Sequence, residues 1–107
     1  MKIYIKSSED IQKYGIFHAN AEISEKDFNS AWDIVDADSK VEGPIEVFNT
    51  LEEANRVLAK KYHTTLRNER LTGGRIIWGD VYFTAEVDEN GYYDACYNVA
   101  DGELSMW

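Results

Sequence analysis

The sequence predicts an α+β fold, a mostly antiparallel sheet of about five strands with two helices packed on one face. Short segments alternate between apolar and polar residues, two capping motifs precede apolar stripes of helical spacing, and the chain closes with the pattern of a β-hairpin. The expected order of elements is ββαβαββ. A chain of 107 residues, 44% of them hydrophobic, has the size and composition of a single globular domain, residues 1–107.

The first part of the chain is expected to form two strands and a helix. Lys2–Lys6 alternates between apolar and polar residues, and Tyr14–Ile23 is rich in residues that favour strands. Ser24 can cap the backbone amide of Asp27, so a helix is expected to begin there. Four apolar residues with helical spacing form the face of this helix that would pack on the core: Phe28, Ala31, Trp32 and Val35.

A second helix is expected after a short strand over Ile45–Phe48. The segment Asn49-Thr50-Leu51-Glu52-Glu53 is a second capping motif and places the start of this helix near Leu51. Its apolar face would hold Leu51, Ala54, Leu58 and Tyr62, and nearly opposite lies a basic stripe of Arg56, Lys60, His63 and Arg67. The helix would end at Leu71-Thr72-Gly73-Gly74, before a long strand that begins with Ile76–Val87.

Two turns compete for the final hairpin. A two-residue Asn90-Gly91 turn would place Val87 opposite Asp94 and mix apolar with polar residues on each face. A three-residue loop, Glu89-Asn90-Gly91, keeps the faces separate and uses Gly91 for the left-handed position, so it is preferred. The pairs that this loop predicts are Val87 with Tyr93, Ala85 with Ala95, Phe83 with Tyr97, and Val81 with Val99.

Charge is segregated along the chain, whose net charge is −9. Residues 56–75 contain six of the eleven Lys and Arg residues and one acid, while the segments on either side are acidic. Such a pattern indicates the kind of partner rather than the fold. Carboxylates and tyrosines gather on one face of the predicted hairpin, and we expect them to bind a partner: Asp80, Tyr82, Glu86, Asp88, Tyr92 and Asp94. The basic stripe of the second helix is a secondary candidate.

No motif indicates catalysis, a cofactor or a metal. The two histidines, His18 and His63, do not have the spacing of a metal pair, and Cys96 has no cysteine partner for a disulfide or a zinc site. Asp36-Ala37-Asp38 resembles the start of a calcium loop but lacks the required glycine and glutamate further on. No segment resembles a signal peptide or a membrane span, so a cytoplasmic protein is expected.

In size, charge and lack of a catalytic motif, the chain resembles the small acidic proteins of phages and mobile elements that inhibit host restriction and CRISPR effectors. The leading hypothesis is therefore a non-catalytic binding protein that mimics nucleic acid and inhibits a basic, nucleic-acid-handling protein. It would bind neither nucleic acid nor membranes directly. One alternative is a self-associating scaffold or regulatory protein, in which the basic stripe of one copy meets the acidic hairpin of another in a homodimer. The other is a small enzyme that uses Cys96 or a carboxylate pair.

Overall fold

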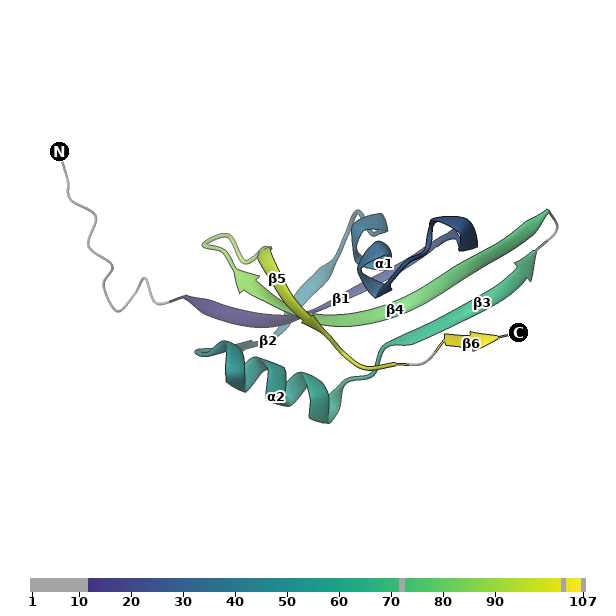
Figure 1. The fold of residues 1–107 in the computed structure, drawn as a ribbon. Coiled ribbons are helices and arrows are strands. Elements are labelled where there is room, and N and C mark those ends of the chain that lie inside the picture. Colours follow the sequence, from purple (N-terminus) through teal and green to yellow (C-terminus); the bar gives the residue numbers. More distant parts are fainter. Residues whose placement is uncertain (1–11, 72, 103, 107) are drawn as a thin grey trace.

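A computed structural model describes residues 12–71, 73–102 and 104–106 (Figure 1). The described residues contain six strands, two α-helices and one short 3-10 helix. In chain order the elements are β1 (Lys13–Ser24), η2 (Glu25–Asp27), α1 (Ala31–Ala37), β2 (Glu42–Phe48), α2 (Leu51–Lys61), β3 (Thr65–Leu71), β4 (Gly74–Val87), β5 (Tyr93–Val99) and β6 (Leu104–Met106). The α+β class and the mostly antiparallel sheet with two helices are confirmed. The predicted strand Lys2–Lys6 lies outside the described residues.

The sheet is built around the antiparallel ladder of β1 and β4. This ladder runs from the pair Lys13 and Val87 to the pair Ser24 and Ile76. The strand order is β2-β1-β4-β3-β6, and β5 pairs with β4 as well. β4 is long enough to hold two strands in succession on its second edge, β3 near its start and β5 near its end. The strands predicted over Tyr14–Ile23 and Ile76–Val87 are thus confirmed.

Two neighbouring residues of β4 show which face of the sheet each helix covers. Trp32 of α1 packs edge-on against Phe83, with ring centroids 5.6 Å apart. The hydroxyl of Thr84 donates a hydrogen bond of 2.7 Å to the side chain of Asn55 in α2. Because successive side chains of a strand point to opposite faces, the two helices lie on opposite faces of the sheet (Figure 1) and not together on one face, as the sequence pattern predicted.

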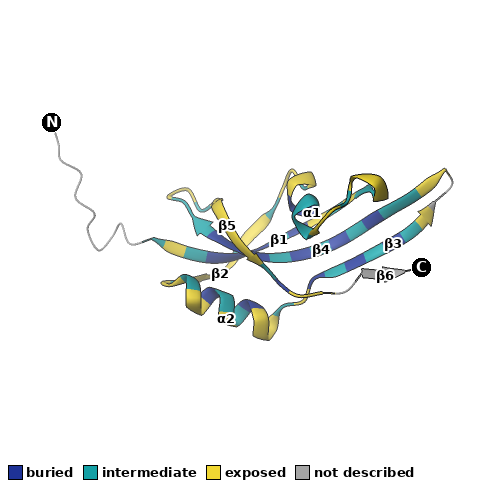
Figure 2. Cartoon of the chain, in the orientation of Figure 1, coloured by how far each residue is buried: buried dark blue, intermediate teal, exposed yellow. Residues whose placement is uncertain are grey.

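The core is divided by the sheet into two parts of unequal size. Figure 2 shows the buried residues along β1, β3 and β4 and on α2. The larger part lies under α1 and includes Phe17, Ile34, Val35, Ile77, Val81 and Phe83. The smaller part lies under α2 and consists of Ile16, Leu58 and Ala100, with Phe48, Tyr62 and Tyr82 packed around them. The rings of Phe17, Phe83 and Tyr93 pack against one another and extend the larger part toward the β4–β5 hairpin.

The first α-helix begins at Ala31 and not after Ser24, so the predicted start is wrong. Ser24 is the last residue of β1 and pairs with Ile76, which extends the strand to the point where the helix was expected. The helix uses a later motif instead. The carboxylate of Asp33 accepts hydrogen bonds from the backbone amides of Asn29 (2.7 Å) and Ser30 (3.0 Å), and these bonds lower its pKa.

The second helix has the predicted start but a different end. The hydroxyl of Thr50 accepts a 3.1 Å hydrogen bond from the amide of Glu53, as the capping motif predicted. The helix ends at Lys61, and the segment Thr65–Leu71 is a strand paired with β4. The predicted helical continuation to Arg67 is therefore wrong, because alternate residues of this segment are buried in the sheet instead.

The hairpin loop is the three-residue loop that was preferred. The amide of Asp88 donates a 2.8 Å hydrogen bond to the carbonyl of Tyr92, and Gly91 has a φ of 85°. Val87 pairs with Tyr93, as predicted. The remaining predicted pairs are wrong, since Ala85 lies opposite Cys96 and Phe83 lies opposite Val99. Two irregularities in the ladder each shift the register by one residue of β5.

Candidate binding surface at the hairpin end

Two of the predicted partner-binding residues lie in the middle of β4 and interact with β1. The carboxylate of Asp80 lies 2.6 Å from the Nε2 atom of His18 and accepts a 2.8 Å hydrogen bond from Asn20. The ring of Tyr82 stacks on that of His18 at 4.6 Å and lies 5.0 Å from the ring of Tyr62. Tyr82 is half-buried beneath α2. The structure thus does not bring Asp80 and Tyr82 together with the hairpin residues on one open face.

Glu86 lies closer to the hairpin and pairs with a tyrosine of β5. Its carboxylate accepts a 2.6 Å hydrogen bond from the hydroxyl of Tyr97. The bond favours the neutral phenol and raises the pKa of Tyr97 to about 12. The ring of Tyr97 packs edge-on against Tyr14 at 5.8 Å. Glu86 therefore orders the face of the hairpin that lies on the α2 side of the sheet.

The other three predicted residues, Asp88, Tyr92 and Asp94, do lie together around the hairpin turn. One carboxylate oxygen of Asp88 accepts hydrogen bonds of 2.9 Å from the amides of Asn90 and Tyr92. These bonds hold the turn in a shape that presents Tyr92, whose exposure is 70%. Asp94 is exposed on the adjoining strand β5. We call this part of the molecule, residues 88–94, the hairpin end.

The predicted basic stripe is not a single face in the structure. Arg56 and Lys60 are exposed on α2, and Arg56 pairs with Glu52 at 2.9 Å. His63 lies after the end of α2, and Arg67 lies on β3. The guanidinium of Arg67 stands 5.3 Å from the ring centre of Trp78. The four side chains are separated because the helix that would have aligned them ends at Lys61.

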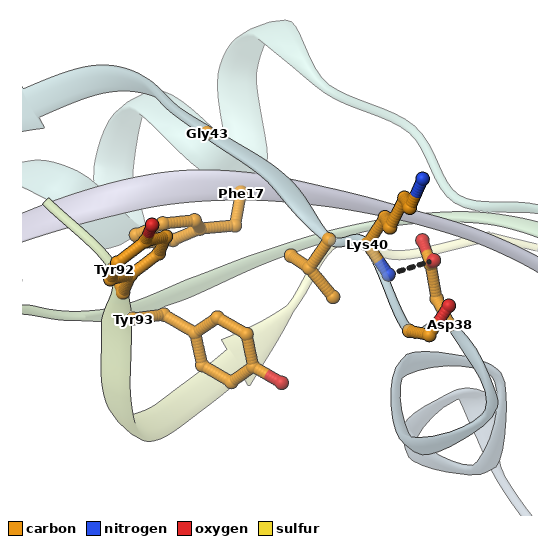
Figure 3. A pocket seen from close by; sticks show the side chains of 8 residues that line it. Phe17, Asp38, Lys40, Gly43, Tyr92 and Tyr93 are labelled. Carbon is orange, nitrogen blue, oxygen red and sulfur yellow. Dashed lines mark hydrogen bonds between the residues drawn. The ribbon is translucent and has the colours of Figure 1, made fainter.

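A pocket of about 370 Å³ opens beside the hairpin end (Figure 3). It is formed by β1, by the connection between α1 and β2, by β2 itself and by the hairpin. The residues that line this hairpin pocket are Phe17, Asp38, Ser39, Lys40, Val41, Gly43, Tyr92 and Tyr93. Only Tyr92 was predicted as a site residue. The others come from three separate segments of the sequence, namely Phe17, residues 38–43 and Tyr93, and no local pattern connects these segments.

Close packing around Phe17 shapes the floor of the hairpin pocket. The ring of Tyr93 packs edge-on against Phe17 at 5.6 Å and against Phe83 at 5.5 Å. Gly43 lies directly over Phe17 with a φ of 134°, and a Cβ atom there would approach the Phe17 ring to 2.7 Å. A glycine is therefore required for β2 to pass this close to the ring.

The wall of the hairpin pocket opposite the tyrosines is held by Asp38. One of its carboxylate oxygens accepts a 2.8 Å hydrogen bond from the amide of Lys40, and the other accepts a 2.9 Å bond from the amide of Asn20. The first bond, drawn in Figure 3, shapes the connection between α1 and β2. The second fastens this connection to β1. Asp38 thus has a fixed position beside the aromatic floor.

Negative charge converges on the hairpin end. Burial raises the pKa of the Tyr93 hydroxyl, and the neighbouring Cys96, Asp36 and Asp38 raise it further. Partial removal from water raises the pKa of the Cys96 thiol, and the charges of Asp36 and Asp94 add to this effect. A raised pKa disfavours the thiolate that a cysteine nucleophile requires. Cys96 is also exposed and does not line the hairpin pocket.

Within the part of the chain that the structure describes, no three His, Cys, Asp or Glu side chains lie close enough together to hold a metal ion. No helix in the same residues has the length and apolar character needed to cross a membrane.

Comparison with known proteins gives no match: neither a protein-family model nor a curated protein matches the sequence, and no solved structure matches the fold.

Proposed function

We propose that this protein is a non-catalytic binding protein that engages a basic partner protein through its hairpin end. The observation that carries the proposal is the exposure of Tyr92 (70%) and Tyr93 (36%) beside the carboxylates of Asp38 and Asp94. Tyrosines contribute large, rigid contact area and are enriched at the centres of interfaces. Their setting among carboxylates favours a partner with positive charge.

The charge of the hairpin end supports this choice of partner. Residues 86–94 contain four acids, Glu86, Asp88, Glu89 and Asp94, and no Lys or Arg. The net charge of −9 adds a long-range field that attracts basic surfaces and repels nucleic acid. Proteins that bind nucleic acids have basic surfaces, which this negative field would attract. We therefore propose that the partner is such a protein and that binding inhibits it by occupying its nucleic-acid groove.

Charge reversal at the hairpin end tests the proposal. Glu89 and Asp94 are exposed, and within the described residues neither side chain makes a hydrogen bond or ion pair, so E89K/D94K should leave the fold intact. The tagged variant should capture at least about tenfold less partner from lysate than the wild type, because an attractive contact becomes repulsive. Duplex DNA in excess should release the partner from the wild-type protein.

The matched control is E22K/D27K, which changes the net charge equally but on β1 and η2, far from the hairpin end along the sheet. Capture by the control should remain close to that of the wild type. Equal losses in the two variants would show that net charge alone matters and would contradict a site at the hairpin end. Capture that DNA does not reduce would contradict the proposed inhibition of a nucleic-acid groove.

A second candidate function, self-association, is favoured by the edge strand β2. Ile45 and Val47 are exposed to 46% and 51% on this strand, which among the described residues pairs with β1 alone. Exposed apolar side chains on an edge strand favour pairing with another chain. A dimer formed in this way should persist at high salt and dissociate in the variant V47K. A monomer at all protein concentrations in light scattering would exclude it.

A further inference from the structure

We propose that the hairpin pocket receives an arginine side chain of the partner protein. This inference rests on the proposed function and names the chemical group that the hairpin end recognises. It is carried by three observations: an aromatic floor, a carboxylate wall, and a volume suited to one side chain.

The aromatic floor provides the first part of the recognition. Phe17, Tyr92 and Tyr93 line the hairpin pocket, and Figure 3 shows the two tyrosines across the pocket from Asp38. A guanidinium ion that lies over an aromatic face gains a cation–π interaction, which grows stronger as water is excluded. Arginine also stacks on rings through its planar group, which lysine cannot do. The floor therefore favours arginine over lysine.

Asp38 provides the second part. Its two oxygens accept one backbone hydrogen bond each, and a carboxylate has about four acceptor positions, so positions remain for a guanidinium. The ion pairs found among the described residues do not include Asp38 or Lys40. Figure 3 shows the side chain of Lys40 directed away from both tyrosines. The carboxylate is thus available for a hydrogen-bonded ion pair with the incoming group.

The size and charge of the hairpin pocket exclude other ligand classes. A volume of about 370 Å³ is at the low end of the range for small-molecule sites, roughly 300–1,000 Å³, and suits one long side chain. Asp38 and the nearby Asp36 repel phosphates and carboxylates. A neutral apolar side chain would fill the floor but would desolvate the carboxylate without replacing its hydrogen bonds.

Titration with small probes tests the inference without the partner. The probe is N-acetyl-arginine amide, and the matched neutral probe is N-acetyl-citrulline amide, which has nearly the same shape without the charge. We expect the arginine probe to shift the NMR signals of Tyr92, Tyr93 and Asp38, with binding in the millimolar range and about tenfold tighter than that of citrulline. Equal binding of the two probes, or shifts centred elsewhere, would overturn the proposal.

Two variants with matched controls locate the effect. Asp38→Asn should weaken arginine binding, whereas Asp27→Asn, the same change of charge at η2, should not. Tyr92→Leu keeps an apolar surface but loses the ring, so it should weaken binding, and Tyr92→Phe should retain it. Unchanged amide spectra elsewhere establish that each variant is folded. Equal affinity in all four variants would overturn the proposal.

Partner capture separates a failure of this inference from a failure of the proposed function. If E89K/D94K abolishes capture while Tyr92→Leu captures as the wild type does, the binding function stands and the arginine pocket is overturned. If the arginine probe binds at the hairpin pocket but no basic partner is captured at any salt concentration, the pocket stands and the proposed function fails.

Discussion

The hairpin end and the opposite end of the sheet, where β3 pairs with the start of β4, both carry many charges but use them differently. At the β3–β4 end, Arg67 lies over Trp78, and the guanidinium of Arg75 donates a 3.0 Å hydrogen bond to Asn68, which itself donates to Glu25. At the hairpin end, the carboxylates of Glu89 and Asp94 make no hydrogen bond or ion pair among the described residues. These side chains of the β3–β4 end interact within the fold, whereas Glu89 and Asp94 of the hairpin end are exposed.

This difference shows why the density of charge in the sequence is a poor guide to the site. Residues 56–75 are the most basic part of the chain, yet the structure distributes them over α2 and β3, where several of them interact with their neighbours. The hairpin end combines unpaired carboxylates with exposed tyrosines. Unpaired charge beside exposed aromatic surface, rather than charge alone, supports a binding role for the hairpin end.

The largest expected effect is on the free energy of unfolding, and it comes from Phe17, the aromatic residue that connects the hairpin end to the core. Phe17 is 1% exposed and contacts both Phe83 and Tyr93. Phe17→Ala should lower the free energy of unfolding by about 3–5 kcal/mol, measured by urea denaturation, and should speed hydrogen exchange at Tyr93. Ile77→Ala, at the other end of the core, should cost about 2–5 kcal/mol.

The two core variants differ in their expected effect on function. Ile77→Ala should leave partner capture unchanged as long as the protein is folded, because Ile77 lies beneath the β3–β4 end. The milder variant Phe17→Leu should remain folded and should still reduce capture, since the floor of the hairpin pocket loses a ring. Equal capture by Phe17→Leu and Ile77→Ala would break the distinction between the two ends.

A smaller effect on stability is expected when either of two turn glycines is replaced by alanine. Gly91 in the hairpin and Gly73 in the β3–β4 turn have φ angles of 85° and 91°, and no atom lies within 4 Å of a Cβ added at either position. Each substitution to alanine should therefore cost about 1–2 kcal/mol in thermal unfolding, from backbone strain alone. Only Gly91→Ala should reduce partner capture, because it shifts Tyr92. A loss of capture in both variants would contradict the assignment.

The smallest expected effect is a loss of stability at alkaline pH, which arises from the hydrogen-bonded pair of Tyr97 and Glu86. The folded protein holds the pKa of Tyr97 at about 12, above its ordinary value of 10.0, first through the hydrogen bond to Glu86. This contribution to stability is complete below pH 10 and is lost as the pH rises toward 12. In Glu86→Gln the pKa of Tyr97 should return toward 10.0. The ¹³C chemical shift of the Tyr97 ring, measured as a function of pH, reports this pKa.

The pair of Tyr62 and Glu46 is the internal control for this titration. The pKa of Tyr62 is also raised to about 12, chiefly by its hydrogen bond to Glu46, on the α2 side of the sheet. Glu86→Gln should leave the titration of Tyr62 unchanged. A parallel shift of both tyrosines would mean that the effect arises from the overall charge of the protein and not from the local hydrogen bond.

Local signals in the sequence were sufficient for the elements that depend on neighbouring residues. The cap at Thr50 and the three-residue loop with Gly91 both follow from side-chain and backbone preferences within a few positions. β3 was missed because Asn68, a polar residue, takes a buried position in its alternating pattern and hides the strand. Its side chain is satisfied there by Arg75 and Glu25, which only the folded sheet brings near.

The hairpin pocket could not be predicted for a similar reason. In the sequence, Phe17 is one residue of the predicted strand Tyr14–Ile23, and Asp38 belongs to the segment that resembles the start of a calcium loop. Their proximity depends on the packing of the connection after α1 across β1, through the bond from the amide of Asn20 to Asp38. The shifted register of β5 adds to the difficulty, because its two irregularities leave no trace in the alternation of residues 93–99.

The pairing of β1 with β4 also has a consequence for the order in which the chain folds. Lys13 pairs with Val87 and Ser24 with Ile76, so β1 leaves the ribosome long before its main partner has been made. Until then the apolar side chains of Ile16, Phe17 and Ala19 have only β2 and the helices to cover them. Contacts between such distant segments slow folding, and apolar surface that stays uncovered during synthesis favours aggregation.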